Sequence, residues 1–257
     1  MGDWFRSTGE FAPGVPRVYC FPHAGGNAAM FLDWQGLLGD EAAIAAVTMP
    51  GRGHRYAEPA PATIDEYADA AAEAVAADAS GPFVLFGHSL GALVAFEVAR
   101  RLRADPRLSH LVASGASAPA LMPSERVRRA AGLHGRAFAE AVGAFGGLPP
   151  EIVAAEELHD LLLPGVQADF RLVAGYRYRA AEPLAIGLTV INGADDDHVT
   201  AERLAGWADE SGGPVERRWV AGGHFYLRDQ PRAVADVLRR VAGADRPAAT
   251  GQSDLLI

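Results

Sequence analysis

The chain contains no lysine, so all 23 of its basic residues are arginines. A wholesale loss of lysine is not a recognised way to stabilise a protein. Alanine, glycine and proline are abundant, and arginine has GC-rich codons whereas lysine does not. The missing lysine therefore indicates a GC-rich host genome and says little about the chemistry of the protein.

Several other features that the sequence lacks exclude further classes of protein. A single cysteine, Cys20, excludes an internal disulfide framework and fits a reducing cytoplasm. No apolar run reaches the length of about 18 residues that a transmembrane helix needs, and the N-terminus lacks the basic-then-apolar pattern of a signal peptide. The formal charge of −9 argues against nucleic acid as a partner. We expect a cytoplasmic protein, monomeric by default, that binds neither membrane nor nucleic acid.

The 257 residues, 49% of them hydrophobic, suffice for one α/β domain with a substantial core. Strand-like and helix-like runs alternate, which predicts a mostly parallel sheet with helices on both faces. The predicted strands are Arg17–Phe21, Ala43–Met49, Phe83–Phe86, His110–Ser114, Gly187–Asn192 and Val215–Val220. The predicted helices are Ala28–Leu38, Ile64–Ala77, Leu90–Arg103, Ala201–Glu210 and Pro231–Val241. Thr63 and Glu66 read as a capping box at the start of the second helix.

One region interrupts the alternation, from about residue 118 to 182. It has helix-like segments and turns but no convincing strand, so it reads as a helical lid inserted over the carboxyl edge of the sheet; a merely packed extra layer is the alternative. Within it, the segment Gly-Gly-Leu-Pro-Pro, Gly146–Pro150, has the unusual backbone requirements of a hinge. The last residues, Asp245–Ile257, are mostly small and polar and are expected to be frayed.

The most informative motif lies in Phe83–Ala99. A short apolar run ends in Gly-His-Ser-Leu-Gly, residues 87–91, and an amphipathic helix-forming run follows at once. A strand that turns sharply into a helix forces the intervening serine, Ser89, into a strained conformation. The two glycines allow close packing, and the helix N-terminus favours developing negative charge. The motif predicts a nucleophile elbow, against an ordinary glycine-flanked turn.

A serine nucleophile needs a base, and the base needs an orienting acid. His224 follows the last predicted strand and two glycines, so its imidazole can reach Ser89; His88, beside the serine, is expected to pack or hydrogen-bond nearby. Three consecutive aspartates follow the preceding strand. We favour Asp196 as the acid because it completes a Gly-x-x-Asp turn, with Asp195 or Asp197 as the alternative.

The run Asp-Asp-Asp-His, residues 195–198, has a rival interpretation as a metal site. Nothing else nearby supplies ligands at a recognisable spacing, so we expect no metal there. The two aspartates that are not the acid are expected to face solvent or to cap the helix that starts near Thr200.

An oxyanion hole needs two backbone donors. The amide of Leu90, directly after the serine, is the natural first donor. A glycine-rich loop after the first predicted strand, Phe21–Asn27, suits the second, and we assign it to the amide of Ala24. A plain strand-to-helix turn would also explain the glycines of this loop.

Four motifs together resemble those of the type II thioesterases, which accompany polyketide synthases and nonribosomal peptide synthetases. They are Phe-Pro-His-Ala-Gly-Gly (21–26), Met-Pro-Gly-Arg-Gly-His-Arg (49–55), Gly-His-Ser-Leu-Gly-Ala (87–92) and Gly-Gly-His-Phe (222–225). The resemblance covers about Arg17 to Val241. It implies an α/β-hydrolase fold with a helical lid. It also implies hydrolysis of acyl groups from the phosphopantetheine arm of carrier proteins, which clears stalled units and needs no cofactor in the enzyme.

Two positions depart from the family pattern. Leu90 stands where members often have methionine, which leaves the backbone donor intact. Asp197 stands where the acid motif usually has proline, which leaves the choice of acid open. The residues alone predict acyl transfer through a serine ester. A carboxylesterase or lipase, an acyltransferase with the same triad, and a silent carrier-binding module are therefore the rival functions.

Overall fold

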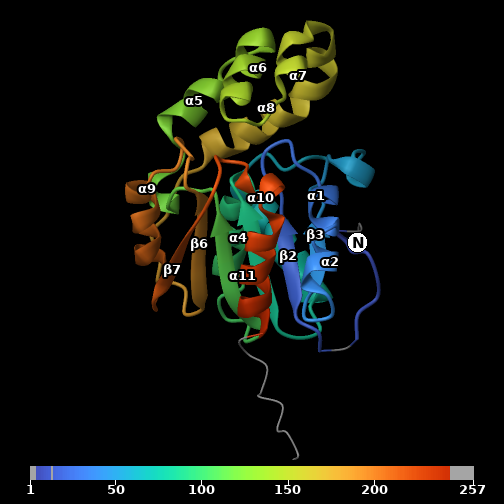
Figure 1. Ribbon diagram of the computed structural model, residues 1–257, viewed down its shortest axis with the longest axis vertical. Coiled ribbons are helices and arrows are strands. Elements are labelled where there is room, and N and C mark those ends of the chain that lie inside the picture. Colours follow the sequence, from blue (N-terminus) through green and yellow to red (C-terminus); the bar gives the residue numbers. More distant parts are fainter. Residues whose placement is uncertain (1–3, 13, 244–257) are drawn as a thin grey trace, which may run out of the picture.

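The computed structural model describes residues 4–12 and 14–243, so the predicted fraying of Asp245–Ile257 lies outside the described residues (Figure 1). Seven strands form one sheet in the order β1-β3-β2-β4-β5-β6-β7, and all neighbours are parallel except β1 and β3. The strands are β1 Phe5–Arg6, β2 Arg17–Phe21, β3 Ala43–Val47, β4 Phe83–His88, β5 Leu108–Ser114, β6 Gly187–Gly193 and β7 Val215–Val220. The predicted mostly parallel sheet is confirmed.

Helices cover both faces of the sheet. One face carries α1 (Ala29–Leu32), α2 (Gln35–Leu38) and α11 (Pro231–Gly243), and the other carries α3 (Ile64–Asp78) and α4 (Leu90–Arg101). Because side chains alternate along a strand, Val18 and Cys20 of β2 join the first layer whereas Tyr19 and Phe21 join the second. Cys20 is fully buried there, and burial raises the pKa of its thiol, which is typical of an inert core cysteine.

The remaining helices of the sheet domain are α9 (Ala201–Ala205) and α10 (Tyr226–Asp229). The predicted helix Ala201–Glu210 is α9 followed by a 3-10 turn, Gly206–Glu210. The predicted helix Ala28–Leu38 is two short helices, α1 and α2. Between them the N–H of Trp34 bonds to the carbonyl of Phe31, three residues back, so the chain tightens there.

The predicted capping box of α3 is half correct. The Thr63 hydroxyl accepts a hydrogen bond from the N–H of Glu66, at 3.1 Å, as expected. The Glu66 carboxylate, however, accepts from the N–H of Ala62 and not from that of Thr63. The acidic side chain therefore reaches one residue further back along the chain, and both bonds still satisfy backbone donors at the helix start.

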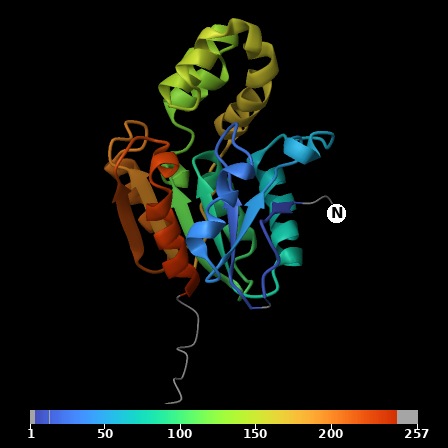
Figure 2. The ribbon, with the colours of Figure 1, turned by 45° about the vertical axis from the view of Figure 1, so that its right-hand side comes forward.

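Residues 118–182, which we call the lid, lie between β5 and β6 and contain no strand. The lid holds α5 (Glu125–Ala131), α6 (Gly135–Ala144), α7 (Pro150–Ala154), α8 (His159–Gly175) and 3-10 turns at Pro119–Leu121 and Glu156–Leu158. Figures 1 and 2 show these helices standing above the sheet, next to the strand ends that carry the site. They share a small apolar core of their own, which includes Phe138 and Phe170.

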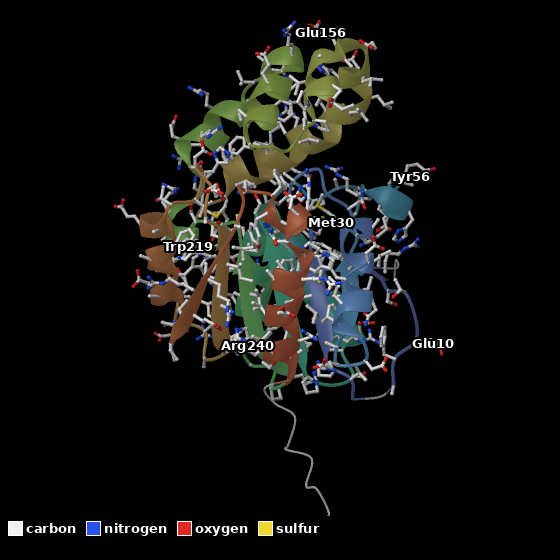
Figure 3. The ribbon with its side chains drawn as sticks, in the orientation of Figure 1. Glu10, Met30, Tyr56, Glu156, Trp219 and Arg240 are labelled. Carbon is white, nitrogen blue, oxygen red and sulfur yellow. The ribbon has the colours of Figure 1, made fainter. Side chains whose placement is uncertain are left out.

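Two large apolar side chains on the surface of the sheet domain lie far apart. Tyr56, in a loop, is 79% exposed and Trp219, on the edge strand β7, is 47% exposed. They project from opposite sides of the sheet domain in Figure 3, so they do not combine into one apolar patch. In the part of the chain that the structure describes, no helix has the length and apolar character to cross a bilayer.

Candidate active site

Ser89 occupies the sharp turn between β4 and α4. Its φ is 56° and its ψ is −115°, and no other non-glycine among the described residues has a positive φ. Such a conformation costs about 1–3 kcal/mol and tends to occur at functional sites. A Cβ on Gly87 would lie 2.0 Å from the carbonyl oxygen of Gly91, and a Cβ on Gly91 would lie 2.1 Å from that of Phe21. Both glycines are therefore required by the close approach of strand and helix, as the motif predicts.

His224 lies in the loop after β7 and is bonded to Asp196, which follows β6. Nδ1 of His224 is 2.8 Å from one carboxylate oxygen of Asp196. The other oxygen accepts from the N–H groups of His198, at 2.8 Å, and Val199, at 3.3 Å. An ionised carboxylate only accepts hydrogen bonds, so Nδ1 carries a hydrogen, and in the neutral form of the ring Nε2 keeps the free lone pair. The arrangement orients the imidazole as a base.

Asp196 is buried, whereas Asp195 and Asp197 are exposed. Burial alone would raise the pKa of Asp196. The hydrogen bond and positive charge of His224, together with the backbone bond from His198, outweigh burial and lower the pKa below its usual value. Asp196 therefore stays ionised at neutral pH. The structure brings the favoured aspartate to His224 and leaves the two alternatives facing solvent, while the cap of α9 is Thr200.

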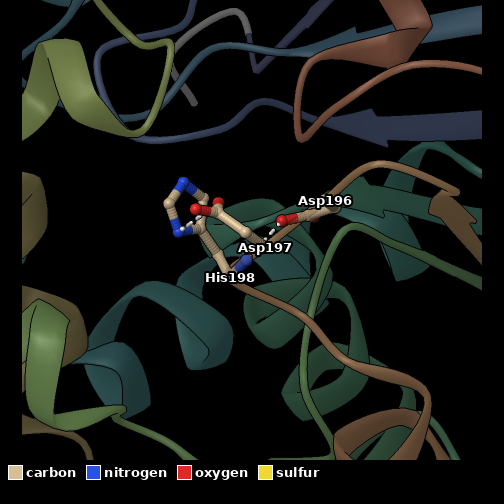
Figure 4. A group of neighbouring side chains, drawn as sticks. All are labelled: Asp196, Asp197 and His198. Atoms are coloured by element: carbon tan, nitrogen blue, oxygen red, sulfur yellow. Dashed lines mark hydrogen bonds and ion pairs between the residues drawn. The ribbon is translucent and has the colours of Figure 1, made fainter.

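Asp196, Asp197 and His198 form a compact group whose possible ligand atoms lie within 4.8 Å of one another (Figure 4). Both oxygens of Asp196 already have partners, and Nδ1 of His198 accepts a hydrogen bond from Arg126 of the lid. Burial and the charge of Arg126 lower the pKa of His198, so that ring is neutral. A cation here would have to displace His224 from Asp196. The group is therefore better explained as the loop that holds the acid.

The two predicted oxyanion donors lie beside Ser89. Leu90 is the first residue of α4, so its N–H lies outside the hydrogen-bond ladder of the helix. Ala24 belongs to the loop after β2, where His23 Nδ1 donates to the carbonyl of Ala24 at 2.8 Å. Within the described ranges, the N–H groups of Ala24 and Leu90 donate to no other residue. Both are thus available to a ligand at Ser89, and Ala24, Ser89, Leu90 and His224 line one cavity.

The family model described as "Thioesterase domain" matches residues 16–241. The chain belongs to the thioesterase family. It is 34% identical over 235 residues to "Thioesterase PikA5" of Streptomyces venezuelae, a match that spans 89% of this chain and 82% of PikA5.

Solved structures agree with this membership. The type II thioesterase BorB from the borrelidin biosynthetic cluster has a TM-score of 0.83 and 31% identity, covering 93% of this chain and 97% of BorB. The thioesterase RedJ of the prodiginine pathway in Streptomyces coelicolor has a TM-score of 0.80 and 34% identity, covering 89% and 86%. The resemblance to type II thioesterases and the predicted α/β-hydrolase fold are confirmed.

The cavity of this thioesterase is polar at Ser89 and His224 and apolar beyond them. The lid supplies most of the apolar wall, namely Met122, Val127, Val142, Phe145, Phe170 and Val173. An apolar cavity with a few convergent polar groups is typical of a small-molecule site. Lid side chains therefore form most of the apolar wall beside Ser89.

A buried hydrogen-bonded chain lies beside the catalytic candidates, and most of it was missed by the sequence analysis. His88 was expected to pack or hydrogen-bond nearby, and its Nδ1 is 2.8 Å from the Ser114 hydroxyl, which is 2.6 Å from the Tyr226 hydroxyl. Burial, with the charge of His224, holds the pKa of His88 well below its usual value. The His88 ring lies 5.1 Å from that of His224, centroid to centroid. The neutral imidazole of His88 therefore packs against the ring of His224.

The buried histidines make the thioesterase sensitive to acid. Burial lowers the pKa of His23 to about 4, despite its bond to Ala24. An unfolded histidine titrates near pH 6.5, so between pH 6.5 and about 4 the unfolded chain binds a proton that the folded chain refuses. The contribution of His23 to the free energy of unfolding is complete above pH 6.5 and is lost as the pH falls from 6.5 to about 4. His23 alone should lower the free energy of unfolding by about 3 kcal/mol between pH 7 and pH 4.

Urea unfolding of the parent and of His23→Gln at pH 7 and pH 4.5 measures this effect. The glutamine amide can still donate to the Ala24 carbonyl but does not titrate. The loss of stability on acidification should be smaller in the variant than in the parent. An identical loss in both proteins would contradict the assignment to His23.

Proposed function

We propose that the chain is a serine thioesterase that hydrolyses acyl groups from the phosphopantetheine arm of carrier proteins, and so clears stalled or aberrant units. The observation that carries this proposal is the bonded pair of His224 and Asp196, in one cavity with the strained Ser89, in a member of the thioesterase family. The relatives BorB and RedJ come from a biosynthetic cluster and pathway, which supports a role in secondary-metabolite assembly.

The geometry supports a two-step mechanism. Ser89 Oγ attacks the thioester carbon while Nε2 of His224 takes the hydroxyl proton. Asp196 stabilises the imidazolium, and the N–H groups of Ala24 and Leu90 stabilise the oxyanion. The carbon–sulfur bond breaks, the pantetheine thiol leaves with the proton from His224, and an acyl-serine ester remains. Water then attacks the ester in the same way, which releases the acid and restores Ser89.

A carrier protein would approach the cavity beside the lid. An acidic carrier protein needs basic side chains near the cavity, and several arginines lie in the lid. Arg126 is engaged within the protein, through His198 and the carbonyl of Ala144. Arg179 is paired with Asp65. Arg128 and Arg129 of α5 are exposed, and the ion pair of Arg128 with Glu125 is long, at 3.7 Å. These two residues are therefore our candidates for carrier docking.

Matched substrates test the function. Acyl-pantetheine thioesters and oxygen esters with the same acyl group should be compared by thiol or alcohol release. We expect kcat/KM to be at least about tenfold higher for the thioester, since the thiol is the better leaving group and the proposed natural substrate. The free acid should be the product when an alcohol or amine acceptor is added. Preference for the oxygen ester would indicate a carboxylesterase, and transfer to the acceptor would indicate an acyltransferase.

A further inference from the structure

The lid contributes one buried acid that the mechanism above does not use. The Asp169 side chain, on α8, is 3% exposed. One carboxylate oxygen accepts from the N–H of Gly25 at 2.8 Å, and the other accepts from Nη2 of Arg52 at 2.8 Å. Burial raises the pKa of Asp169, and the charge of Arg52 and the bond from Gly25 oppose this rise. The Asp169 carboxylate of the lid is thus hydrogen-bonded to the loop that holds Ala24.

Arg52 ties the same part of α8 to the loop after β3. Its Nη2 also donates to the carbonyl of Gly165, one turn before Asp169, at 2.7 Å, and its Nη1 donates to the carbonyl of Gly51 at 3.0 Å. The planar guanidinium with fixed donors suits such a multiple contact better than an ammonium would. The Pro-Gly-Arg-Gly motif and the Pro-His-Ala-Gly-Gly motif therefore meet at Asp169.

Packing reinforces the hydrogen bonds. Gly25 has a φ of +76°, and a Cβ there would lie 2.9 Å from Cγ2 of Val166, so α8 rests directly on this residue. At the end of α8, the Tyr176 hydroxyl donates to the buried carboxylate of Glu97 on α4 at 2.8 Å. Helix α8, on the lower side of the lid in Figure 1, is thus fixed to the elbow helix at one end and to the oxyanion loop in its middle.

The peptide unit between Ala24 and Gly25 is held at both of its polar atoms. His23 Nδ1 donates to its carbonyl, and Asp169 accepts from its N–H. Because a peptide unit is planar, two such bonds fix the orientation of the whole plane. The Ala24 N–H belongs to the neighbouring peptide unit, which shares the Ala24 Cα, so holding this plane restrains the direction of the Ala24 N–H. An oxyanion donor misplaced by a small distance loses much of its effect.

We propose that Asp169 is a positioning residue, which aims the Ala24 N–H at the oxyanion through Gly25 and makes oxyanion stabilisation depend on the seated position of the lid helix α8. This inference rests on the proposed function, since it assumes that Ala24 is an oxyanion donor. It assigns the lid a second role besides forming the wall of the acyl cavity: transition-state stabilisation is complete only when α8 is seated.

The test compares Asp169→Asn with Tyr176→Phe as a matched control. Asparagine is isosteric, but its NH₂ group would face either the Gly25 N–H or the Arg52 guanidinium, so one of the two contacts is lost. We expect kcat to fall by about 10- to 100-fold while KM changes by less than about threefold. Tyr176→Phe removes a buried bond from the same helix without touching the oxyanion loop, so it should lower the Tm and leave kcat nearly unchanged.

Two further measurements keep the test decisive. Rates are expressed per serine labelled by a fluorophosphonate probe, which counts folded sites. A boronic-acid inhibitor becomes tetrahedral when Ser89 adds to its boron, and the adduct needs the oxyanion hole. Its affinity should fall in Asp169→Asn, whereas that of a non-hydrolysable thioether analogue should not. If the asparagine variant does not accumulate, Asp169→Glu carries the same test, because it keeps the charge but shifts the acceptor.

The outcomes separate this inference from the proposed function. A parent protein that fails to label at Ser89 would contradict the serine mechanism itself. A parent that labels and turns over, with kcat of Asp169→Asn within about twofold of it, would overturn only the role of Asp169. An equal loss of kcat in Tyr176→Phe would also overturn the role of Asp169, since it would show that the loss occurs while the bond from Gly25 to Asp169 is still present.

Discussion

Replacement of Ser89 by alanine is expected to lower kcat for thioester hydrolysis by about 10⁴- to 10⁶-fold, because no other group in the triad can form the acyl ester. The variant keeps a Cβ at the turn, so the backbone strain at φ 56° remains and the Tm should change little. The readouts are thiol release from an acyl-pantetheine and trapping of the acyl-enzyme by mass spectrometry.

Labelling with a fluorophosphonate probe provides the control for Ser89→Ala. The parent should take up one label, on Ser89, and the variant none. Thermal unfolding of both proteins shows whether the variant is folded. A folded Ser89→Ala protein that hydrolyses the thioester at the rate of the parent would rule out nucleophilic catalysis by this serine.

Replacement of Asp196 by asparagine is expected to have the second-largest effect, a fall in kcat of about 10³- to 10⁴-fold. The buried carboxylate fixes the hydrogen on Nδ1 of His224 and stabilises the imidazolium. An amide can present its NH₂ group to Nδ1 instead, which places the hydrogen on Nε2 and removes the base. Steady-state kinetics over a series of pH values measure the effect, and the plateau values of kcat are compared.

The neighbouring aspartates supply matched controls. Asp195→Asn and Asp197→Asn remove the same charge from the same loop, but both side chains are exposed. Each should keep kcat within about threefold of the parent. If Asp197→Asn loses as much activity as Asp196→Asn, the acid is not uniquely Asp196, and the assignment from the hydrogen bond is wrong.

Local pattern predicted most of the fold. Strands β2 and β7 begin and end at the predicted residues, and the other major strands differ by a few residues at their ends. Strand β1 escaped prediction because two residues carry no periodicity. The predicted helix Ala28–Leu38 failed in its middle, where tertiary packing of Phe31 and Trp34 against Phe86 competes with regular helical bonding.

Some residues of the candidate site could likewise be predicted from local sequence, and others could not. The positions of Ser89 and Leu90 follow from a turn motif, since close packing of strand and helix leaves room only for glycine at positions 87 and 91. His224 follows from its place after the last strand. The contacts of Asp169 escaped prediction because they join residues 117 and 144 positions apart, with no local signal on either side.

The sequence by itself determined the order of strands and helices, the elbow at Ser89 and the thioesterase motifs, because each depends on residues close together in the chain. Only the tertiary structure decided which of three adjacent aspartates meets His224, since burial and the geometry of one hydrogen bond distinguish them. It alone also placed a lid carboxylate against the oxyanion loop, because such contacts depend on how distant segments pack.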